Sequence, residues 1–411
     1  MVGPIPVLRA WRCDVTDTAV LSRPLRLRAP GGQAVVSETP VVLAPMAGVT
    51  NAAYRQLCRE QAEAGGPAGE GRKGLFVCEM ITSRGLVERD RKSLEMLAFD
   101  PGESLHSVQL YGVDAPTMAK ATELLCGEFG VGHVDLNFGC PVPKVTRKGG
   151  GGVLPWKRDR LRAILTATVR AAEPYGVPVT MKTRKGIDAD HLTYLDAGRI
   201  AEDSGCAAIA LHGRTVSQAY SGTADWDSIA ELVGAVDIPV LGNGDIWEAE
   251  TALAMVRHTG VAGVVIGRGC LGRPWLFRDL ADAFAGHHRR ARPTLGEVAA
   301  TVRRHGELLS ELMGEQRGVT DLRKHIAWYF KGYPVGGEVR RGLGLASSLA
   351  ELDAWFARLD LDQPFPEAEI GSPRGRQGTP REKVVMPEGW LDDTSGMELD
   401  LAGAELSDSG G

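Results

Sequence analysis

Cys140 has the setting that most suggests chemistry, because it lies between a glycine and a proline in the stretch DLNFGCPVPKVTRKGGGG. A thiol of ordinary pKa is protonated near neutral pH and can donate a proton. The cations that follow it, Lys144, Arg147 and Lys148, would instead favour the thiolate. Because most free cysteines are buried and inert, the residues alone leave open whether Cys140 has a chemical role.

Two pairs of basic side chains could face a common centre. Residues two apart in a strand share a face, so Lys182 and Arg184 in PVTMKTR point the same way. His212 and Arg214 do so in CAAIALHGR. Lys182 could form a Schiff base, clamp a phosphate or face an electron-rich ring, and a surface lysine is the remaining alternative. His212 is either a hydrogen-bonded core residue or part of the same site.

Glycine-rich loops follow the last two apolar runs before residue 290. They are GNGD, from Gly242 to Asp245, and GRG, from Gly267 to Gly269, with Arg268 between its two glycines. Glycine lets backbone N–H groups approach a phosphate, and helix N-termini add positive potential. Turns also need glycine, but two such loops in succession predict a phosphate-binding site.

Eight short apolar runs supply the elements that would bring these residues together. The runs begin at residues 40, 74, 105, 133, 178, 206, 238 and 263. Most are bounded by Gly, Pro or Asn, which is typical of buried parallel strands. Intervals of about 25 to 45 residues leave room for a helix after each strand. We therefore predict an α/β fold of the (β/α)8 TIM barrel class, since an open doubly wound sheet would need a Gly-rich turn after its first strand.

The composition changes along the chain and predicts four segments. Residues 1–35 form an extension, 36–290 the barrel, 291–360 an all-helical domain with apolar residues three and four apart, and 361–411 a disordered acidic tail. The tail carries eleven acidic and four basic residues, whereas residues 287–345 carry eleven basic and six acidic ones. We expect that removal of the tail leaves activity intact.

The length, composition, net charge and cysteine count argue against several classes of protein. The chain has 411 residues, is 43% hydrophobic and has a formal net charge of -5, which is ordinary for a globular protein. It has no run of about 18 apolar residues and its start lacks a signal-peptide core, so we expect no membrane span. Seven cysteines without a CxxC pair suggest neither a disulfide framework nor a zinc cage. We expect a cytoplasmic protein without a metal.

The chain resembles the tRNA-dihydrouridine synthases, flavoenzymes that reduce uridine in tRNA. The resemblance rests on motifs in the family's order, which span residues 41–277. They are APMAGVTNAAYR (44–55), VQLYG (108–112), DLNFGCPVPKVTRKGGG (135–151), MKTRKG (181–186), LHGRT (211–215), GNGDI (242–246) and IGRGCLGRPWLF (266–277). In addition, LRKHIAWYFKG (322–332) is similar to the helical domain of bacterial members.

The resemblance implies FMN in the barrel mouth, with NADPH as its reductant. The implied cofactor-binding residues are Pro45, Met46 and Ala47 along the ring system, Gln109 and Lys182 at its pyrimidine edge, and His212, Asn243, Gly244, Asp245, Gly267 and Arg268 around the ribityl chain and phosphate. Reduced FMN would pass a hydride to C6 of a flipped-out uracil, and Cys140 would protonate C5. The implied contacts to the base or the tRNA are Asn137, Arg184, Arg214, Arg323 and Lys324. We expect a monomer.

Some features depart from the family's pattern, and other functions stay open. Gly152 stands where the family usually has Ser or Ala, and the run of four glycines could loosen its loop. The insert at residues 62–74, which we expect to be flexible, and the acidic tail have no clear counterpart. The alternatives are a flavin barrel acting on free pyrimidines, as dihydroorotate dehydrogenases do, a non-catalytic tRNA-binding protein, and a phosphate-binding aldolase or isomerase without flavin.

Overall fold

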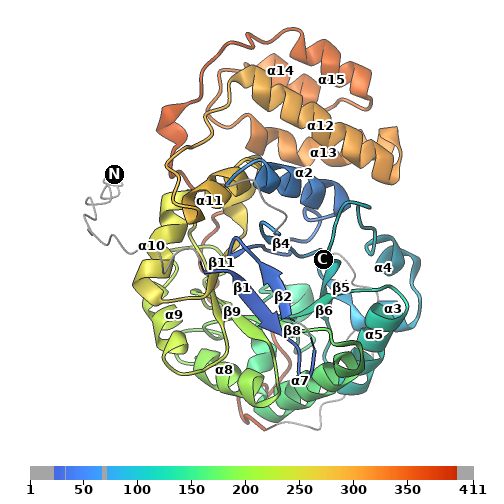
Figure 1. Cartoon of the computed structure of the whole chain (residues 1–411), viewed down its shortest axis with the longest axis vertical. Coiled ribbons are helices and arrows are strands. Elements are labelled where there is room, and N and C mark those ends of the chain that lie inside the picture. The colour runs from blue at the N-terminus through green and yellow to red at the C-terminus, as the bar shows by residue number, and fades with distance from the viewer. Residues whose placement is uncertain (1–22, 33, 67–71, 396–411) are drawn as a thin grey trace.

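The computed structural model describes residues 23–32, 34–66 and 72–395, and a parallel barrel lies at its centre (Figure 1). One strand begins in each predicted run: β3 (Val41–Leu43), β4 (Leu75–Phe76), β6 (Ser107–Tyr111), β7 (His133–Phe138), β8 (Val179–Arg184), β9 (Ala208–His212), β10 (Val240–Asn243) and β11 (Gly263–Ile266). The sheet order is β4-β3-β11-β10-β9-β8-β7-β6-β5. Every residue of β6, β9, β10 and β11 is buried, as expected for strands covered on both faces.

The second strand is interrupted, which the sequence did not predict. The run that begins at Gly74 forms β4 and then β5 (Ile81–Thr82). β4 pairs with β3, and β5 pairs with β6. Between them, the backbone N–H of Cys78 donates to the carbonyl of Ser107 at 3.0 Å. The two pieces therefore bridge β3 and β6 and close the sheet into a barrel.

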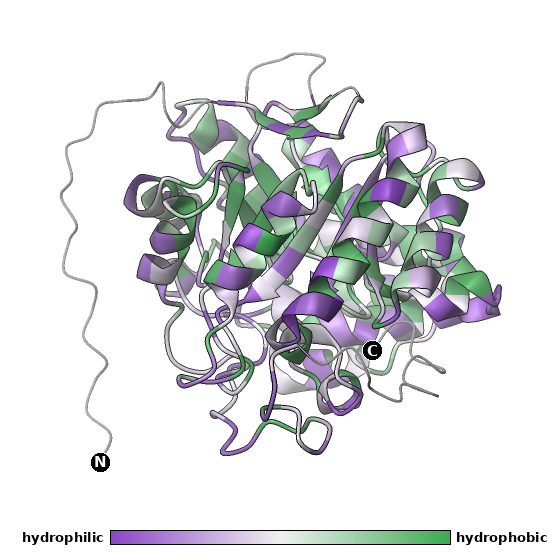
Figure 2. Cartoon of the chain, turned by 90° about the horizontal axis from the view of Figure 1, so that it is seen from below, coloured by the Kyte–Doolittle hydropathy of each residue, from purple (hydrophilic) through white to green (hydrophobic). Residues whose placement is uncertain are grey.

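Helices follow the strands, and most of them cover the outside of the barrel. They are α2 (Ala52–Glu63), α3 (Ser83–Val87), α4 (Arg91–Glu95), α5 (Ala115–Gly127), α6 (Pro143–Thr146), α7 (Arg158–Ala172), α8 (Tyr194–Asp203), α9 (Trp226–Val233), α10 (Ala249–Thr259) and α11 (Leu276–Phe284), with the 3-10 turns η1 (Gly151–Trp156), η2 (Glu173–Tyr175) and η3 (Arg268–Cys270). Figure 2 shows hydrophobic residues concentrated on the strands and polar ones on the outer helix faces. Within the described ranges, no helix is long and apolar enough to cross a membrane.

An antiparallel hairpin is formed by residues 25–28 and 34–37, at the junction of the predicted extension and barrel. β1 (Leu25–Arg28) pairs with β2 (Ala34–Ser37) and crosses the barrel in Figure 1. Leu25 and Leu27 pack in one buried cluster with residues near the amino ends of barrel strands, including Leu75, Ala208 and Leu241. The hairpin thus plugs the amino end of the barrel and leaves the carboxyl end for the site. Residues 1–22 lie outside the described part of the chain.

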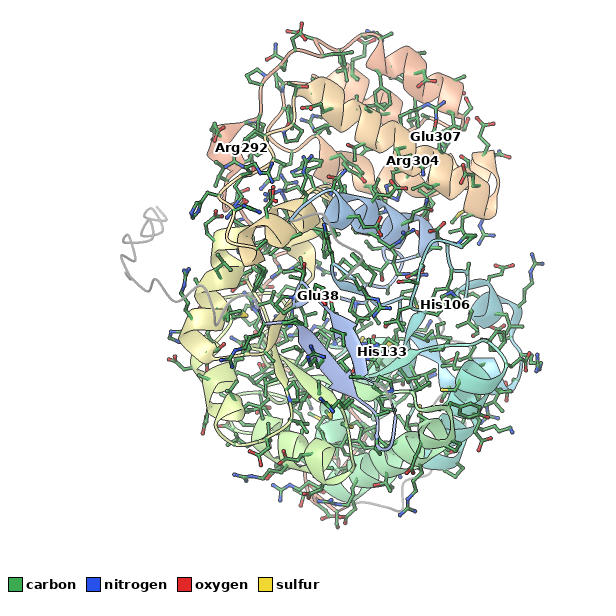
Figure 3. The ribbon with its side chains drawn as sticks, in the orientation of Figure 1. Glu38, His106, His133, Arg292, Arg304 and Glu307 are labelled. Carbon is green, nitrogen blue, oxygen red and sulfur yellow. The ribbon has the colours of Figure 1, made fainter. Side chains whose placement is uncertain are left out.

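The predicted helical domain is formed by α12 (Leu295–Met313), α13 (Glu315–Tyr329), α14 (Gly337–Leu343) and α15 (Leu349–Phe356). Its core includes Leu309, Leu322 and Phe330 and continues into Leu57 of α2. Arg304 lies on α12 near this junction (Figure 3), and its guanidinium donates to the Glu60 carboxylate at 2.9 Å. An apolar core shared with α2 fixes the domain beside the barrel.

The structure corrects the prediction of a disordered tail for residues 361–395. After the turn η4 (Glu367–Glu369), residues 371–395 run back over the barrel, and we call them the C-terminal strap. Val384 and Trp390 of the strap are buried against Val153, Ile187 and Val216. The composition suggested disorder because Pro, Gly and acids dominate it, but burial of Val384 and Trp390 helps to attach the chain to the barrel. Residues 396–411, the rest of the predicted tail, lie outside the described residues.

Candidate active site

A cavity of about 420 Å³ opens at the carboxyl ends of the barrel strands. This volume lies within the range that holds a small ligand or cofactor. The predicted residues that line it are Pro45, Met46, Ala47, Gln109, Asn137, Cys140, Lys182, Arg184, His212, Asn243, Gly244, Asp245, Gly267 and Arg268. The barrel therefore brings together side chains from seven strand ends that are up to 223 positions apart.

The loop after β7 presents Cys140 to this cavity. Asn137 Oδ1 accepts hydrogen bonds from the N–H groups of Gly139 at 3.1 Å and Cys140 at 3.0 Å. The carbonyl of Cys140 accepts from the N–H of Gly152 at 3.0 Å, and Arg184 Nε donates to the carbonyl of Gly139 at 2.8 Å. The backbone on both sides of the thiol is thus fixed, which a reacting group needs for orientation.

Cys140 is half-buried, whereas the other free cysteines in the described part of the chain are buried. Burial raises the pKa of the Cys140 thiol above its ordinary range, although a backbone hydrogen bond from Val142 and the cations Arg184, Arg381 and Lys182 oppose this rise. The thiol is therefore protonated near neutral pH. It can donate a proton, which favours the acid role over the thiolate.

Gly152 is closely enclosed by its neighbours. It is buried, and a Cβ atom built on it would lie 2.4 Å from Cγ2 of Val216. A serine or alanine would therefore require Val216 to move. The glycine allows η1 to approach Val216 and to keep its hydrogen bond to the Cys140 loop.

Lys182 extends from β8 into the cavity. Burial and then the neighbouring Arg184 lower the pKa of its ammonium to about 8. Across the residues that the structure describes, this ammonium makes no hydrogen bond with another protein group. A partly desolvated cation without a hydrogen-bond acceptor suits an anionic or electron-rich partner in the cavity.

A chain of hydrogen bonds supports the polar end of the cavity. Asn137 Nδ2 donates to Gln109 Oε1 at 2.8 Å, and Gln109 Nε2 donates to Asp135 Oδ2 at 2.7 Å. Thr180 completes the chain by donating to Asp135 Oδ1 at 2.6 Å. Because Asn137 also holds the backbone of Cys140, this network links the thiol loop to β6, β7 and β8. Sequence reasoning missed Asp135, although it starts the DLNFG motif.

The loops after β10 and β11 form the end of the cavity opposite the Gln109–Asn137 network. Asn243 ties these strands together by donating to the carbonyl of Val265 at 2.7 Å. Asp245 has φ of 55°, a left-handed conformation that is uncommon outside glycine and that clusters at functional sites. Burial and four nearby cations hold the pKa of His212 well below its ordinary value, so its imidazole is neutral. Arg268 supplies the positive charge at this end of the cavity.

Arg214 does not line the cavity. It is buried outside the cavity wall, where its guanidinium donates to the carbonyls of Ser221 at 2.9 Å and Gly222 at 2.6 Å. A third contact joins it to Asp245 Oδ2 at 2.8 Å. Its donors are therefore used to hold the loop after β9 and to orient Asp245. A contact of Arg214 with the base or its phosphates stays a prediction.

The basic residues of the helical domain are mostly engaged with the protein. Arg323 donates to the carbonyls of Ala346 and Leu345, both at 2.8 Å, which supports the turn after α14. Lys324 is exposed and donates to Asp321 at 2.6 Å beside the loop of Gly48 at the barrel mouth. Exposed ion pairs contribute only about 0–1 kcal/mol, so such cations can exchange partners. Of the two, Lys324 is closer to the cavity.

Several residues that line the cavity were not predicted from the sequence. Tyr220 and Trp247 are two of them, and their rings lie under the guanidinium of Arg268, with centroids 4.8 Å and 5.1 Å away. Met80, Trp328 and Arg376 also line the cavity. Trp328 lies in the helical-domain motif that carried the resemblance. The spacing of the other unpredicted residues does not mark them as lining residues, because the geometry of the loops brings them to the cavity.

Comparison with known proteins gives the family. Residues 42–361 match the family described as Dihydrouridine synthase (Dus). The "Probable tRNA-dihydrouridine synthase" of Mycobacterium tuberculosis (strain ATCC 25618 / H37Rv) is 53% identical over 91% of this chain and 95% of its own length. The protein of the same name from Mycobacterium leprae (strain TN) is 52% identical and covers 90% and 100%, and "tRNA-dihydrouridine synthase B" of Xanthomonas campestris is 39% identical and covers 73% and 86%. This chain therefore belongs to the dihydrouridine synthase family.

Proposed function

We propose that this protein reduces uridine in tRNA to dihydrouridine, with FMN as cofactor and NADPH as reductant. The observation that carries the proposal is the meeting of Cys140 and Lys182 in one cavity at the carboxyl end of the barrel. Membership in the dihydrouridine synthase family and the names of the relatives support the same activity.

The residues of the cavity fit FMN. Pro45, Met46 and Ala47 offer an apolar wall to a flat ring system, and Lys182 offers a cation without a hydrogen-bond acceptor in the described chain. At the other end, Gly267 and Arg268 offer backbone and a guanidinium to a phosphate. When bound, FMN would supply the hydride that saturates the pyrimidine double bond.

The chain itself supplies orientation and the proton. Cys140 donates its proton to C5 of the uracil, becomes a thiolate, and regains a proton from solvent. Its raised pKa keeps the proton available at neutral pH. Asn137 sets the direction of this loop, and Arg184 holds it from the side of β8. Gln109 and Lys182 would hold the pyrimidine edge of the cofactor.

The substrate is a tRNA rather than a free pyrimidine. The helical domain places α13 beside the barrel mouth, where Lys324 and Trp328 lie close to the cavity. A free base has no need of such a surface, which argues against an enzyme like dihydroorotate dehydrogenase. A uridine in folded RNA has to leave its stack to reach the cavity. Contacts to phosphates then supply affinity that falls as salt rises.

Incubation with unmodified tRNA tests this function. The purified protein, saturated with FMN and supplied with NADPH, is incubated with a tRNA transcript and, separately, with free uridine. We expect dihydrouridine in nucleoside digests of the tRNA and none from free uridine. Unchanged tRNA in the presence of bound, reducible flavin would overturn the proposal, and product from free uridine would favour the free-pyrimidine alternative.

A further inference from the structure

The C-terminal strap crosses the mouth of the barrel. Near its start, the guanidinium of Arg374 is buried and donates to the carbonyls of Trp328 at 2.8 Å and Leu271 at 3.3 Å. The next contact is at the phosphate end of the cavity, where Arg268 Nη1 donates to the carbonyl of Arg376 at 2.8 Å. The strap therefore passes from the helical domain to the loop after β11.

The strap then reaches the loops after β9 and β7. The N–H of Arg381 donates to the carbonyl of Ser217 at 2.8 Å, which fixes the backbone at this point. The guanidinium of Arg381 donates through Nη1 to the carbonyl of Pro141, the residue directly after Cys140. The backbone contact holds the strap while the side chain alone reaches the thiol loop.

The far end of the strap is anchored on η1 and α7. Trp390 is buried, and its Nε1 donates to the carbonyl of Val153 at 3.1 Å. The ammonium of Lys157 lies 5.3 Å from the centroid of the Trp390 ring. The N–H of Arg158 donates to the carbonyl of Thr394 at 2.9 Å. Because both ends are attached, the position of Arg381 over Pro141 is set by the fold and not by a free tail.

We propose that Arg381 is a positioning residue that holds the loop of Cys140 in its reacting geometry. Hydrogen bonds from the barrel already restrain the near side of the thiol, through Asn137 and Arg184. Arg381 restrains the far side, at Pro141. The inference rests on the proposed function, in which Cys140 donates the proton. It extends the active site into a segment whose composition suggested disorder, so removal of the tail should lower activity, contrary to the expectation from the sequence.

The test compares full-length variants in tRNA reduction. In Arg381→Ala, we expect kcat for dihydrouridine formation to fall about tenfold, because a misplaced acid slows proton transfer. KM for tRNA should change less than about twofold, since the residue acts on the loop and not on the substrate. Arg381→Lys can still donate to the Pro141 carbonyl and should recover most of the rate.

Lys383→Ala is the matched control. Lys383 is exposed on the same strap, and in the described part of the chain it has no hydrogen bond or ion pair, so its removal takes away one positive charge and no contact. We expect wild-type kcat and KM. Melting temperature and flavin content of each variant separate a local effect from a loss of folding.

Three results would overturn the inference. Wild-type kcat in Arg381→Ala would show that the strap does not position the thiol, and an increase in KM alone would make Arg381 a tRNA-binding residue. An equal loss in Lys383→Ala would assign the effect to charge. The proposed function is tested separately: if Cys140→Ala blocks tRNA reduction while Arg381→Ala does not affect it, the inference fails and the function stands. If Cys140→Ala reduces tRNA normally, both fail.

Discussion

Lys182 has a lowered pKa of about 8 because it is buried in the barrel next to Arg184. Its charge is costly for the protein without cofactor, yet it is what an anionic cofactor edge would bind. Lys182 therefore lowers the stability of the cofactor-free protein but would strengthen the binding of the cofactor. At pH 7 the ammonium is still charged, and the charge is lost as pH rises through about 8.

Replacement of Lys182 by Met tests both effects, on cofactor binding and on stability. Loss of a charged hydrogen bond should weaken FMN binding by roughly 10- to 100-fold, whereas the cofactor-free protein should melt a few degrees higher. Wild-type affinity should also decline as pH rises through about 8, and Lys182→Met should remove this decline. The checks are flavin fluorescence titration and thermal melting, with the exposed Lys120→Met as control. Unchanged affinity in Lys182→Met would contradict the assigned role.

At the scale of elements, the junction between the barrel and the helical domain holds a buried aromatic cluster. The rings of His305 and His325 are 4.7 Å apart, and His325 stacks on Tyr54 at 5.7 Å. Tyr329 shares a hydrogen bond of 3.0 Å with His305 Nδ1. In the described structure, neither ring nitrogen of His325 has a partner. Burial lowers the pKa of His305 to about 3 and that of His325 well below its ordinary value.

Because of these two buried histidines, we expect the free energy of unfolding to decrease as the pH becomes acidic. Both are neutral when folded and take up a proton near pH 6.5 when unfolded. Their contribution to stability is therefore complete above about pH 6.5 and is lost as pH falls from there towards 3, by up to about 1.4 kcal/mol per pH unit for each histidine. We expect His325→Phe to flatten this loss in denaturant unfolding between pH 6.5 and 4.5. His288→Phe, at an exposed position, should keep the wild-type slope, and an equal slope in His325→Phe would contradict the account.

The element pattern was predictable where hydrophobicity decides it. Eight apolar runs yielded the parallel strands, because a strand buried on both faces has to be apolar throughout. The interruption between β4 and β5 was not predictable, since Val77–Met80 reads as a continuation of the same run. The strap was misjudged for a related reason. Its composition is that of a disordered segment, and the attachment depends on the pocket that Val153, Ile187 and Val216 offer to Trp390.

The site was predictable to the extent that motifs mark strand ends. Most predicted residues line one cavity because the carboxyl ends of barrel strands converge. The contacts of Arg214 with the carbonyls of Ser221 and Gly222 could not be predicted, because hydrogen bonds to the backbone of a loop cannot be read from a sequence. Arg381 was missed for the same reason, since its contact joins positions 240 residues apart.

At the scale of the whole molecule, three parts of the chain meet at the barrel mouth. The barrel supplies Cys140 and Lys182, the helical domain supplies α13 beside the opening, and the strap joins the two across it. The hairpin β1–β2 closes the opposite end, so the proposal places tRNA and cofactor together at the carboxyl end. In the proposed reaction, Cys140, whose loop is held by the barrel and the strap, would complete the reduction.

The most direct test is therefore Cys140→Ala in the full-length, flavin-loaded protein, with dihydrouridine counted in tRNA digests. Cys126→Ala, on α5 and away from the cavity, is the matched control. We predict that Cys140→Ala binds FMN and oxidises NADPH like the wild type but forms at least about 100-fold less dihydrouridine, the contribution typical of a positioned acid. Dihydrouridine formation at the wild-type rate in Cys140→Ala would contradict the account.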